Sequence, residues 1–416
     1  MNTVMRVPGH HRVSRAQAHR AAALQLLRRH HRLSRTEIAR RSGLSEPSVS
    51  RTIRLLMRQR LVVPDGAARP SGGRPAIPLR LDDGLHRSIG VDIHGWATQI
   101  SVGTLSGRIL ESLHFRTPAS PAKTLDRIAA SVLALSGQLV DRELIGVGVS
   151  ARGLVNSRTG VVERGNDPAW TRIAVRQILE QRLGLPVFVE NNVRAAALAE
   201  YHYGSPDVQD SRCLLFVKVD EGVGISMILD GELYCGQHMA AGEFGQMVIA
   251  AADTAATHDR PGCLETLASN EALCQRFRAR GGRGRRAGGD CGAQAHQICQ
   301  AAMAGDRAAV EALRETARYL GIGISNAIWG LDPDAVIVDG AIAEAWPLVA
   351  PLIQAHFADG QEFLNFRNLI LRPSALRGAA AIVGAAALPF QSVFAAGEHE
   401  FQGRAASEAS PAHLSR

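Results

Sequence analysis

Apolar side chains in the first 62 residues recur at intervals of three and four, which is the spacing of amphipathic helices. One helix is predicted over residues 16–30, where Ala22, Leu26 and Leu27 share a face. Another is predicted after Ser45, and its apolar stripe consists of Val49, Ile53, Leu56 and Met57. Short amphipathic helices can bury a common core, so the pattern indicates a small helical domain.

Polar residues mark a shorter helix between these two. Ser34 precedes it and Glu37 lies three residues further on, which is the arrangement of a capping box. Gly43 ends this helix, and Pro47 lies in the first turn of the next. The order helix, glycine-bearing turn, helix is that of a helix-turn-helix motif, whose second helix enters the major groove of DNA.

A stretch rich in Pro, Gly and Ser follows the helices. Val62 and Val63 predict a short strand, and the alternating Ile77, Leu79 and Leu81 predict its return partner. The segment between them is either the wing of a winged helix-turn-helix or a plain linker.

From Arg87 onward, predicted strands alternate with helices. The first half has strands at 88–93, 97–104 and 108–115, helices at about 121–138 and 171–183, a buried strand "PVFVENN" and a helix over 191–203. The same order recurs from Cys213, with strands around a glycine turn, helices at about 264–279, 294–304 and 306–329, and a buried strand "DAVIVDG". Two successive units of this kind predict an α/β protein with two matching lobes.

Charge is distributed unevenly between the two parts. Residues 1–80 hold 17 Arg, no Lys and three acidic residues, a net charge of +14, whereas the whole chain carries +8. Such a basic segment is typical of proteins that bind nucleic acid, and a disordered basic tail would lack the apolar periodicity found here. We therefore expect the helix-turn-helix to bind double-stranded DNA.

The candidate DNA-binding residues are serines and arginines on and around the two helices of the motif, together with arginines of the wing. Arginine can fork onto guanine, and a serine hydroxyl suits a phosphate or any base. The expected base contacts are Ser48 and Arg51, the expected phosphate contacts are Arg35, Arg40 and Arg54, and the further candidates are Ser45, Ser50, Arg69 and Arg74. A helix pair that serves only as a scaffold is the structural alternative.

Composition narrows the class of protein. No apolar stretch reaches the roughly 20 residues of a membrane-spanning helix, and the first residues lack the apolar run of a secretory signal. Six scattered cysteines indicate reduced thiols, so a soluble cytoplasmic protein is expected. Residues 278–293 are expected to form a flexible insertion or a second nucleic-acid contact, and residues 393–416 a disordered tail.

Five motifs of the α/β part follow one another in a specific order: "GNDPAW" (165–170), "VENN" (189–192), "AAGEFG" (240–245), "GCLE" (262–265) and "LDPDAVIVDG" (331–340). In this order they resemble the ROK family of sugar kinases and transcriptional regulators, and the fused helix-turn-helix resembles its repressor branch. The resemblance implies an α/β fold with an N-terminal winged helix-turn-helix followed by a two-lobed, actin-like (ribonuclease-H-like) sugar-kinase fold. The implied domains are the DNA-binding domain at 13–82, the first lobe at 87–202 and the second lobe at 203–392.

The resemblance also implies that the kinase chemistry is lost. Where the kinases have a phosphate turn Asp-x-Gly-Gly-Thr, this chain has Asp92, Ile93, His94, Gly95 and Trp96. Where they have the aspartate that accepts the proton of the sugar hydroxyl, this chain has Asn192, whose amide has no useful basicity at neutral pH. We therefore expect no enzymatic activity and no cofactor.

A structural zinc that similar ROK proteins carry is also expected to be absent. The resemblance places His258 and Cys263 at two of the four ligand positions, and it places Gln246 where the family has histidine. Two ligands fall short of the four that a closed zinc site requires.

The sugar contacts implied by the resemblance are polar side chains from several motifs, namely Asn166, Asn191, Asn192, Glu243, Gln246 and Glu265. Amides and carboxylates of this kind hydrogen-bond to hydroxyl groups. Two alternatives stay open: the asparagines at 191 and 192 only cap the helix that follows, or Glu243 is a surface acid beside a glycine turn.

Three functions fit these observations. The first is a DNA-binding transcriptional regulator, a repressor of carbohydrate uptake or metabolism genes, whose degenerate kinase domain senses a sugar or sugar derivative. It implies a DNA operator and a homodimer or homotetramer as partners. The second is an active sugar kinase with an attached DNA-binding arm. The third is a regulator with a vestigial pocket that responds to a protein partner.

Overall fold

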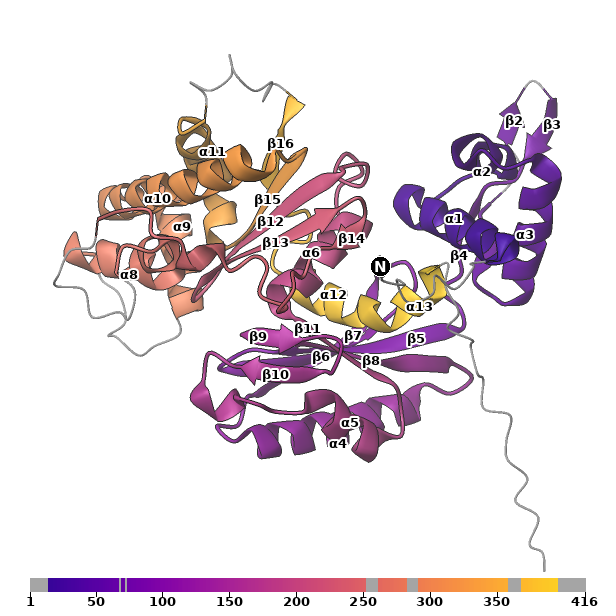
Figure 1. Cartoon of the computed structure of the whole chain (residues 1–416), viewed down its shortest axis with the longest axis horizontal. Helices are drawn as coiled ribbons and strands as arrows, with labels where there is room; N and C mark the ends of the chain where they lie inside the picture. Colours follow the sequence, from indigo (N-terminus) through magenta and orange to yellow (C-terminus); the bar gives the residue numbers. More distant parts are fainter. Residues whose placement is uncertain are drawn as a thin grey trace, which may run out of the picture.

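The computed structural model describes the backbone of residues 14–66, 69–71, 73–251, 261–282, 291–357 and 368–395. Side chains are described over the same ranges except for residues 69–76. The chain forms a small N-terminal domain and two larger lobes (Figure 1).

The N-terminal domain consists of three helices and a wing hairpin. Its elements are α1 (Arg15–His30), α2 (Arg35–Ser42), α3 (Glu46–Arg58), β1 (Val62–Pro64), β2 (Arg69–Ser71), β3 (Gly73–Ala76) and β4 (Leu79–Leu81). β1 pairs with β4 and β2 pairs with β3, both antiparallel, so the segment is a wing rather than a plain linker. Ile77, which we expected on the return strand, precedes it and is exposed.

The ends of α2 agree with the positions predicted from the sequence. Ser34 and Glu37 form the predicted capping box, and Gly43 adopts the left-handed conformation (φ 69°) that ends α2. The buried stripe of α1 differs from the prediction, because Leu24 is fully buried while Ala22 is only partly buried. The reason is that α1 also packs against the C-terminal end of the described chain.

The first lobe contains a five-stranded sheet with the order β11-β8-β5-β6-β7. Its elements are β5 (His86–Ile93), β6 (Ala97–Gly103), β7 (Ile109–Arg116), α4 (Pro121–Gln138), β8 (Glu143–Ala151), β9 (Leu154–Asn156), β10 (Val161–Arg164), α5 (Val175–Leu183) and β11 (Val187–Asn191). β5, β6 and β7 form the predicted antiparallel meander, and β8 and β11 are parallel to β5. α4 and α5 cover one face of this sheet (Figure 1).

The second lobe repeats the arrangement with the order β14-β13-β12-β15-β16. Its elements are β12 (Cys213–Val219), β13 (Val223–Leu229), β14 (Glu232–Leu233), α7 (Leu264–Ala268), α8 (Asn270–Ala279), α9 (Cys291–Met303), α10 (Arg307–Leu331), β15 (Ala335–Gly340), α11 (Trp346–Gln354) and β16 (Ile370–Pro373). β12 to β14 are antiparallel, whereas β15 and β16 are parallel to β12. The repeated order confirms the two matching lobes.

Two helices, α6 (Asn192–Tyr203) and α12 (Ala380–Ala387), lie between the two sheets (Figure 1). α12 approaches the first sheet so closely that a Cβ added at Gly148 would lie 1.9 Å from the carbonyl oxygen of Ala385. A Cβ added at Gly90 would lie 2.7 Å from the backbone nitrogen of Ala386. Glycine at both strand positions lets the helix backbone pack directly on the sheet.

Several predicted boundaries differ from the structure. The helix expected over 264–279 is two helices, because Ser269 is extended (ψ 171°) between α7 and α8. The helix expected from residue 171 begins at Val175, because Ile173 forms a β-bridge with Val162.

The C-terminal segment also differs from the expected boundaries. The second lobe was expected to extend to residue 392, but α12 packs on the first sheet and on α6. The tail was expected to begin at residue 393, but Val393 and Phe394 are buried in α13 (Gln391–Phe394) and pack against the N-terminal domain. Residues 396–416 and 283–290 lie outside the described residues.

Within the described part of the chain, no helix combines the length and apolar character needed to cross a membrane.

Candidate functional site

The candidate DNA-binding surface is the exposed face of α3. Val49, Ile53 and Leu56 are buried in the domain core. Arg51 and Arg54 lie on the opposite side of the helix and are exposed. The helix therefore offers the cationic face that the sequence predicts.

The serines at the start of α3 bond to each other instead of capping the helix. Ser45 occupies the N-cap position but makes no side-chain cap hydrogen bond, and its hydroxyl donates to Ser48 Oγ at 3.0 Å. The backbone N–H groups of the first turn thus lack a side-chain cap from Ser45. Such groups at a helix N-terminus can donate to a phosphate oxygen.

The remaining DNA-binding candidates are divided between α2, α3 and the wing. Arg35 and Arg40 are exposed on α2, and Ser50 is half-buried on α3. Arg69 and Arg74 lie on β2 and β3, and their side chains are outside the described residues.

The candidate sugar pocket lies between the two lobes. Five of the six expected sugar contacts line one pocket, which we name the sugar pocket: Asn166, Asn191, Asn192, Glu243 and Glu265. The first three come from the first lobe and α6, and the two carboxylates come from the second lobe. The sixth, Gln246, is not in the lining, and its Nε2 donates to Glu265 Oε1 at 3.4 Å.

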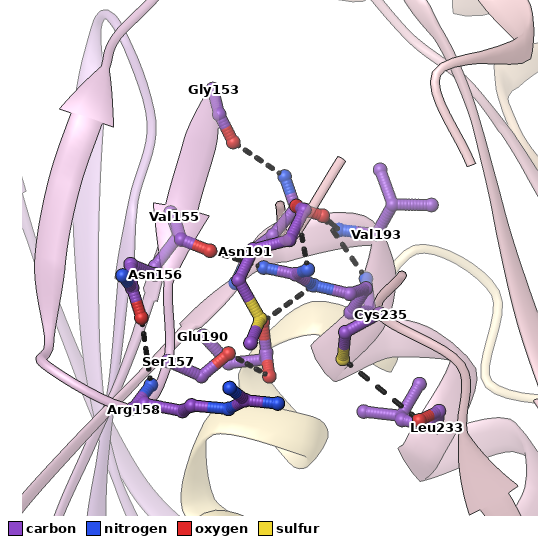
Figure 2. A network of polar contacts seen from close by, with 12 residues as sticks. Gly153, Val155, Asn156, Ser157, Arg158, Glu190, Asn191, Val193, Leu233 and Cys235 are labelled. Carbon is purple, nitrogen blue, oxygen red and sulfur yellow. Dashed lines mark hydrogen bonds and ion pairs between the residues drawn. The ribbon is translucent and has the colours of Figure 1, made fainter. Parts of the chain in front are cut away.

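The two adjacent asparagines have different surroundings, and Figure 2 shows the contacts of Asn191. Asn191 Oδ1 accepts from the N–H groups of Val193 (2.8 Å) and Arg194 (3.2 Å), and its Nδ2 donates to the carbonyl of Gly153 at 2.9 Å. Asn191 therefore caps α6, as one of the alternatives held. Asn192 is 7% exposed, and no described side chain or backbone group makes a hydrogen bond to its amide. Its amide is available to a ligand.

The two carboxylates face the same pocket. Glu265 Oε2 accepts from the N–H of Val223 at 3.2 Å, and Gly222 makes room for it, because a Cβ there would lie 2.3 Å from that oxygen. Burial, followed by the negative charge of Glu265, raises the pKa of Glu243 above its ordinary value. Paired carboxylates are suitable acceptors for neighbouring hydroxyls of a polyol.

A buried arginine of α6 that the sequence analysis did not single out contacts both lobes. Arg194 Nε lies 2.6 Å from Glu190 Oε1, and the guanidinium donates to the carbonyls of Val155 (2.6 Å) and Met239 (3.0 Å). Met239 belongs to the second-lobe loop that leads to Glu243, so Arg194 ties this loop to α6. The signal in the sequence is an arginine directly before the alanines of "VRAAALAE".

Two turns of the first lobe contact one turn of the second lobe across the cleft. His94 Nε2 lies 3.3 Å from Asp220 Oδ2, and Arg152 Nη1 lies 2.7 Å from Glu221 Oε2. Burial raises the pKa of Asp220, but Lys218, His94 and Arg152 outweigh burial and hold this pKa below its ordinary value. The acidic pair in "VDEGVG", which makes both of these contacts, was not singled out by the sequence analysis.

The turn after β5 is preceded by the carboxylate of Asp92 but contains two large side chains, His94 and Trp96. Asp92 accepts a hydrogen bond from the hydroxyl of Ser150 at 2.7 Å. His94 stands where the kinases have a glycine, and Trp96 is 52% exposed beside it.

The absence of zinc stays a prediction. Cys263 is buried, and His258 lies outside the described residues. Among the residues that the structure describes, no group of three His, Cys, Asp or Glu side chains could hold a metal ion.

Both parts of the chain match known protein families. Residues 88–392 match the ROK family, and residues 14–70 match the MarR family. The DNA-binding transcriptional dual regulator NagC of Escherichia coli (strain K12) is 30% identical over 349 residues, which cover 82% of this chain and 84% of NagC. The xylose repressor of Bacillus subtilis (strain 168) is 27% identical over 324 residues, or 76% of this chain and 80% of the repressor.

Solved structures show the same fold. A ROK family transcriptional regulator, a homologue of the E. coli MLC protein, superimposes with a TM-score of 0.72 at 25% identity and covers 91% of this chain and 97% of its own. A ROK family glucokinase from Streptomyces griseus in complex with glucose and AMPPNP gives a TM-score of 0.62 at 28% identity. It covers 73% of this chain and 99% of its own.

Proposed function

The chain belongs to the ROK family, and on this premise we propose that it is a DNA-binding transcriptional regulator that represses genes of carbohydrate uptake or metabolism. The winged helix-turn-helix binds the operator, and the sugar pocket binds a sugar or sugar derivative as effector. A homodimer or homotetramer places two copies of α3 in successive major grooves.

One observation carries the proposal: the pocket holds groups that can bind a sugar, while an amide stands at the position of the catalytic base. Asn192 lies in the sugar pocket with Glu243 and Glu265, so hydroxyls can be bound. The amide cannot accept the proton of the hydroxyl that a kinase would phosphorylate. A site of this kind senses its ligand without converting it.

The relatives support the same reading. NagC is named a DNA-binding transcriptional dual regulator, and the B. subtilis relative is named a xylose repressor. Both alignments include most of each protein, so the likeness extends beyond the ROK part. The nature of this chain's effector stays open between a sugar and a sugar derivative.

A single helix connects the pocket with the DNA-binding domain. α6 begins at Asn192 in the sugar pocket and ends at Tyr203, and its 12 residues span about 18 Å. Near its end, the hydroxyl of Tyr201 accepts from Arg29 Nη2 of α1 at 2.9 Å. An effector that binds one lobe arrangement better than another can therefore shift the position of the DNA-binding domain.

The kinase alternative is favoured by the likeness to ROK kinases such as the S. griseus glucokinase. His94 and Trp96 stand in the turn that resembles the first phosphate turn of the kinases, and His94 Nε2 lies 3.3 Å from Asp220 Oδ2. Incubation with ATP and a panel of hexoses is expected to give no sugar phosphate in a coupled assay. Turnover that depends on Asp92 would establish the kinase instead.

The proposal is tested by DNA binding. Fluorescence anisotropy with the region upstream of its own gene should show binding that weakens steeply between about 50 and 200 mM salt, because arginines displace counterions from phosphates. Arg51→Ala should abolish the preference for this region over unrelated DNA. Glu232→Ala, on β14 away from α3, is the control and should bind as the wild type does. Equal affinity for any sequence by the wild type would refute a specific regulator.

The sensor half is tested on the same complex. One sugar from a panel should raise the melting temperature of the protein and change its DNA affinity. If DNA binding is specific but no sugar or sugar phosphate has either effect, the regulator responds to another signal, such as a protein partner.

A further inference from the structure

Trp96 is an aromatic residue held at the edge of the cleft between the lobes. It lies in the turn between β5 and β6, where its carbonyl accepts the N–H of Thr117 at 3.1 Å. The ring of His94 packs edge-on against the indole with the centroids 6.3 Å apart, and His94 is itself paired with Asp220. The backbone is thus fixed while the indole remains 52% exposed. A fixed and exposed indole is a ready contact for a ligand, because little side-chain entropy remains to be lost.

A cavity of about 720 Å³, which we name the outer cleft, is lined by Trp96 and Trp170. Arg152 and Asn166 line both the outer cleft and the sugar pocket, so the two cavities adjoin each other. A sugar ring held by the sugar pocket therefore has a large, unfilled space directly beside it.

The lining of the outer cleft has the chemistry of a carbohydrate subsite. Arg116 supplies donors, Asp167 supplies an acceptor, and Asn166 supplies both. A pyranose ring has C–H groups on its faces, which pack on an aromatic ring, and hydroxyls on its edges, which need such polar partners. Aromatic and polar groups together thus match a sugar ring better than a purely apolar ligand.

We propose that the effector is a glycoside of at least two sugar rings, with one ring in the sugar pocket and the next against Trp96 in the outer cleft. This inference rests on the proposed sensor function and names its ligand class. Trp96 is then a specificity-determining residue, because it contacts only the second ring and separates disaccharides from monosaccharides.

Trp96 also lines a second cavity of about 740 Å³, which includes the carboxylates of Asp220, Asp339 and Glu344. The outer cleft has as many carboxylates, namely those of Asp167, Glu221 and Glu271, so charge does not distinguish the two cavities. Asn166, which we expect to contact the sugar, lines the outer cleft and the sugar pocket but not the second cavity. We therefore place the second ring in the outer cleft.

The test compares matched ligand pairs on the full-length protein: glucose with cellobiose, N-acetylglucosamine with its β-1,4 disaccharide, xylose with xylobiose, and mannose with mannobiose. Affinities are measured by calorimetry, and the tryptophan fluorescence is followed in parallel. For at least one pair, the disaccharide is expected to bind about tenfold or more tightly than the monosaccharide. Trp96→Ala should remove this advantage and leave monosaccharide affinity unchanged, whereas Trp96→Phe should retain most of it.

Trp329→Ala is the matched control, because Trp329 is 44% exposed on α10 and belongs to the lining of neither the outer cleft nor the sugar pocket. It should retain the disaccharide advantage. If monosaccharides bind and alter DNA affinity but no disaccharide binds more tightly, the inference fails and the proposed function stands. If Trp96→Ala lowers the affinity for monosaccharides and disaccharides equally, the role of Trp96 in binding the second ring is refuted. If no saccharide of either length binds while DNA binding is specific, the inference and the sensor function fail together.

Discussion

At the scale of single residues, two adjacent side chains of one motif have different roles. Asn191 uses its carboxamide to satisfy backbone groups at the start of α6 and at Gly153, whereas the amide of Asn192 has no such bonds within the described structure. The sequence "VENN" could not distinguish these roles, because both asparagines were compatible with helix capping and with sugar binding. The difference comes from backbone geometry, since only the residue at the N-cap position points back at the free N–H groups.

Alanine substitutions should separate the two roles. Asn191→Ala is expected to lower the free energy of unfolding by about 1 kcal/mol, the usual cost of losing an N-cap. Asn192→Ala should leave stability nearly unchanged and lower effector affinity about tenfold, because a hydrogen-bonded hydroxyl of the ligand loses its partner. Urea denaturation and calorimetry measure the two effects. Equal loss of stability in both variants would contradict this division.

Protonation of Glu243 should weaken effector binding as the pH falls. Burial and the charge of Glu265 raise its pKa above the ordinary value of 4.5. As the pH falls through this raised pKa, the carboxylate gains a proton and loses acceptor capacity, so effector affinity should fall at a higher pH than for an ordinary glutamate. Glu243→Gln should bind more weakly at neutral pH and lose this pH dependence. Calorimetry between about pH 7 and 5 tests both expectations.

At the scale of elements, α6 joins two surfaces that the sequence presents as separate. Its first residue lines the sugar pocket, and its last turn contacts α1 through Tyr201. The neighbouring His202 is buried, and burial, followed by the charges of Arg28 and Arg29, lowers its pKa well below the ordinary value. His202, which lies at the end of α6 near the arginines of α1, is therefore neutral.

Substitution at this contact should weaken the coupling between sugar and DNA. Tyr201→Phe removes the hydroxyl that accepts from Arg29 but keeps the packed ring. Sugar affinity and DNA affinity measured alone should change less than about threefold, while the effect of sugar on DNA affinity shrinks by a larger factor. Tyr234→Phe, an exposed tyrosine away from α1, is the control. Unchanged coupling in Tyr201→Phe would show that the signal passes by another route.

The elements that the sequence predicted correctly are those with strong local signals. The capping box at Ser34 and the repeated meander of the two lobes came from periodicity and turn residues, which act over a few positions. The break at Ser269 has a local signal that the sequence analysis missed, because its hydroxyl caps α8 by accepting the N–H of Ala272. The burial of Phe394 depends on packing with the distant N-terminal domain, so no local pattern revealed it. The same holds for Arg194, whose partners come from both lobes.

At the scale of the whole molecule, the C-terminal segment links all three parts. α12 packs between the two sheets, and α13 continues to the DNA-binding domain. There, the guanidinium of Arg28 lies 4.1 Å from the centre of the Phe394 ring, and Gln25 Nε2 donates to the carbonyl of Phe394 at 3.4 Å. A change in lobe arrangement therefore reaches the DNA-binding domain through α6 and through α13 together, and the two attachments fix where α3 lies relative to the pocket.

A fixed position of α3 in each copy makes the spacing of the operator decisive. If two copies bind together, their recognition helices should occupy half-sites whose centres are about one helical turn, or a multiple of it, apart. Inserting about half a turn of DNA between the half-sites should weaken binding at least about tenfold, because it rotates one half-site to the other side of the duplex. Inserting a whole turn of DNA returns both half-sites to the same side of the duplex but increases the distance between them. The DNA affinity of a rigid dimer should therefore recover only in part. Effector should weaken binding most on the native spacing, where both copies are engaged. Footprinting and anisotropy on the three spacings measure this, and equal affinity for all of them would show that each copy binds DNA on its own.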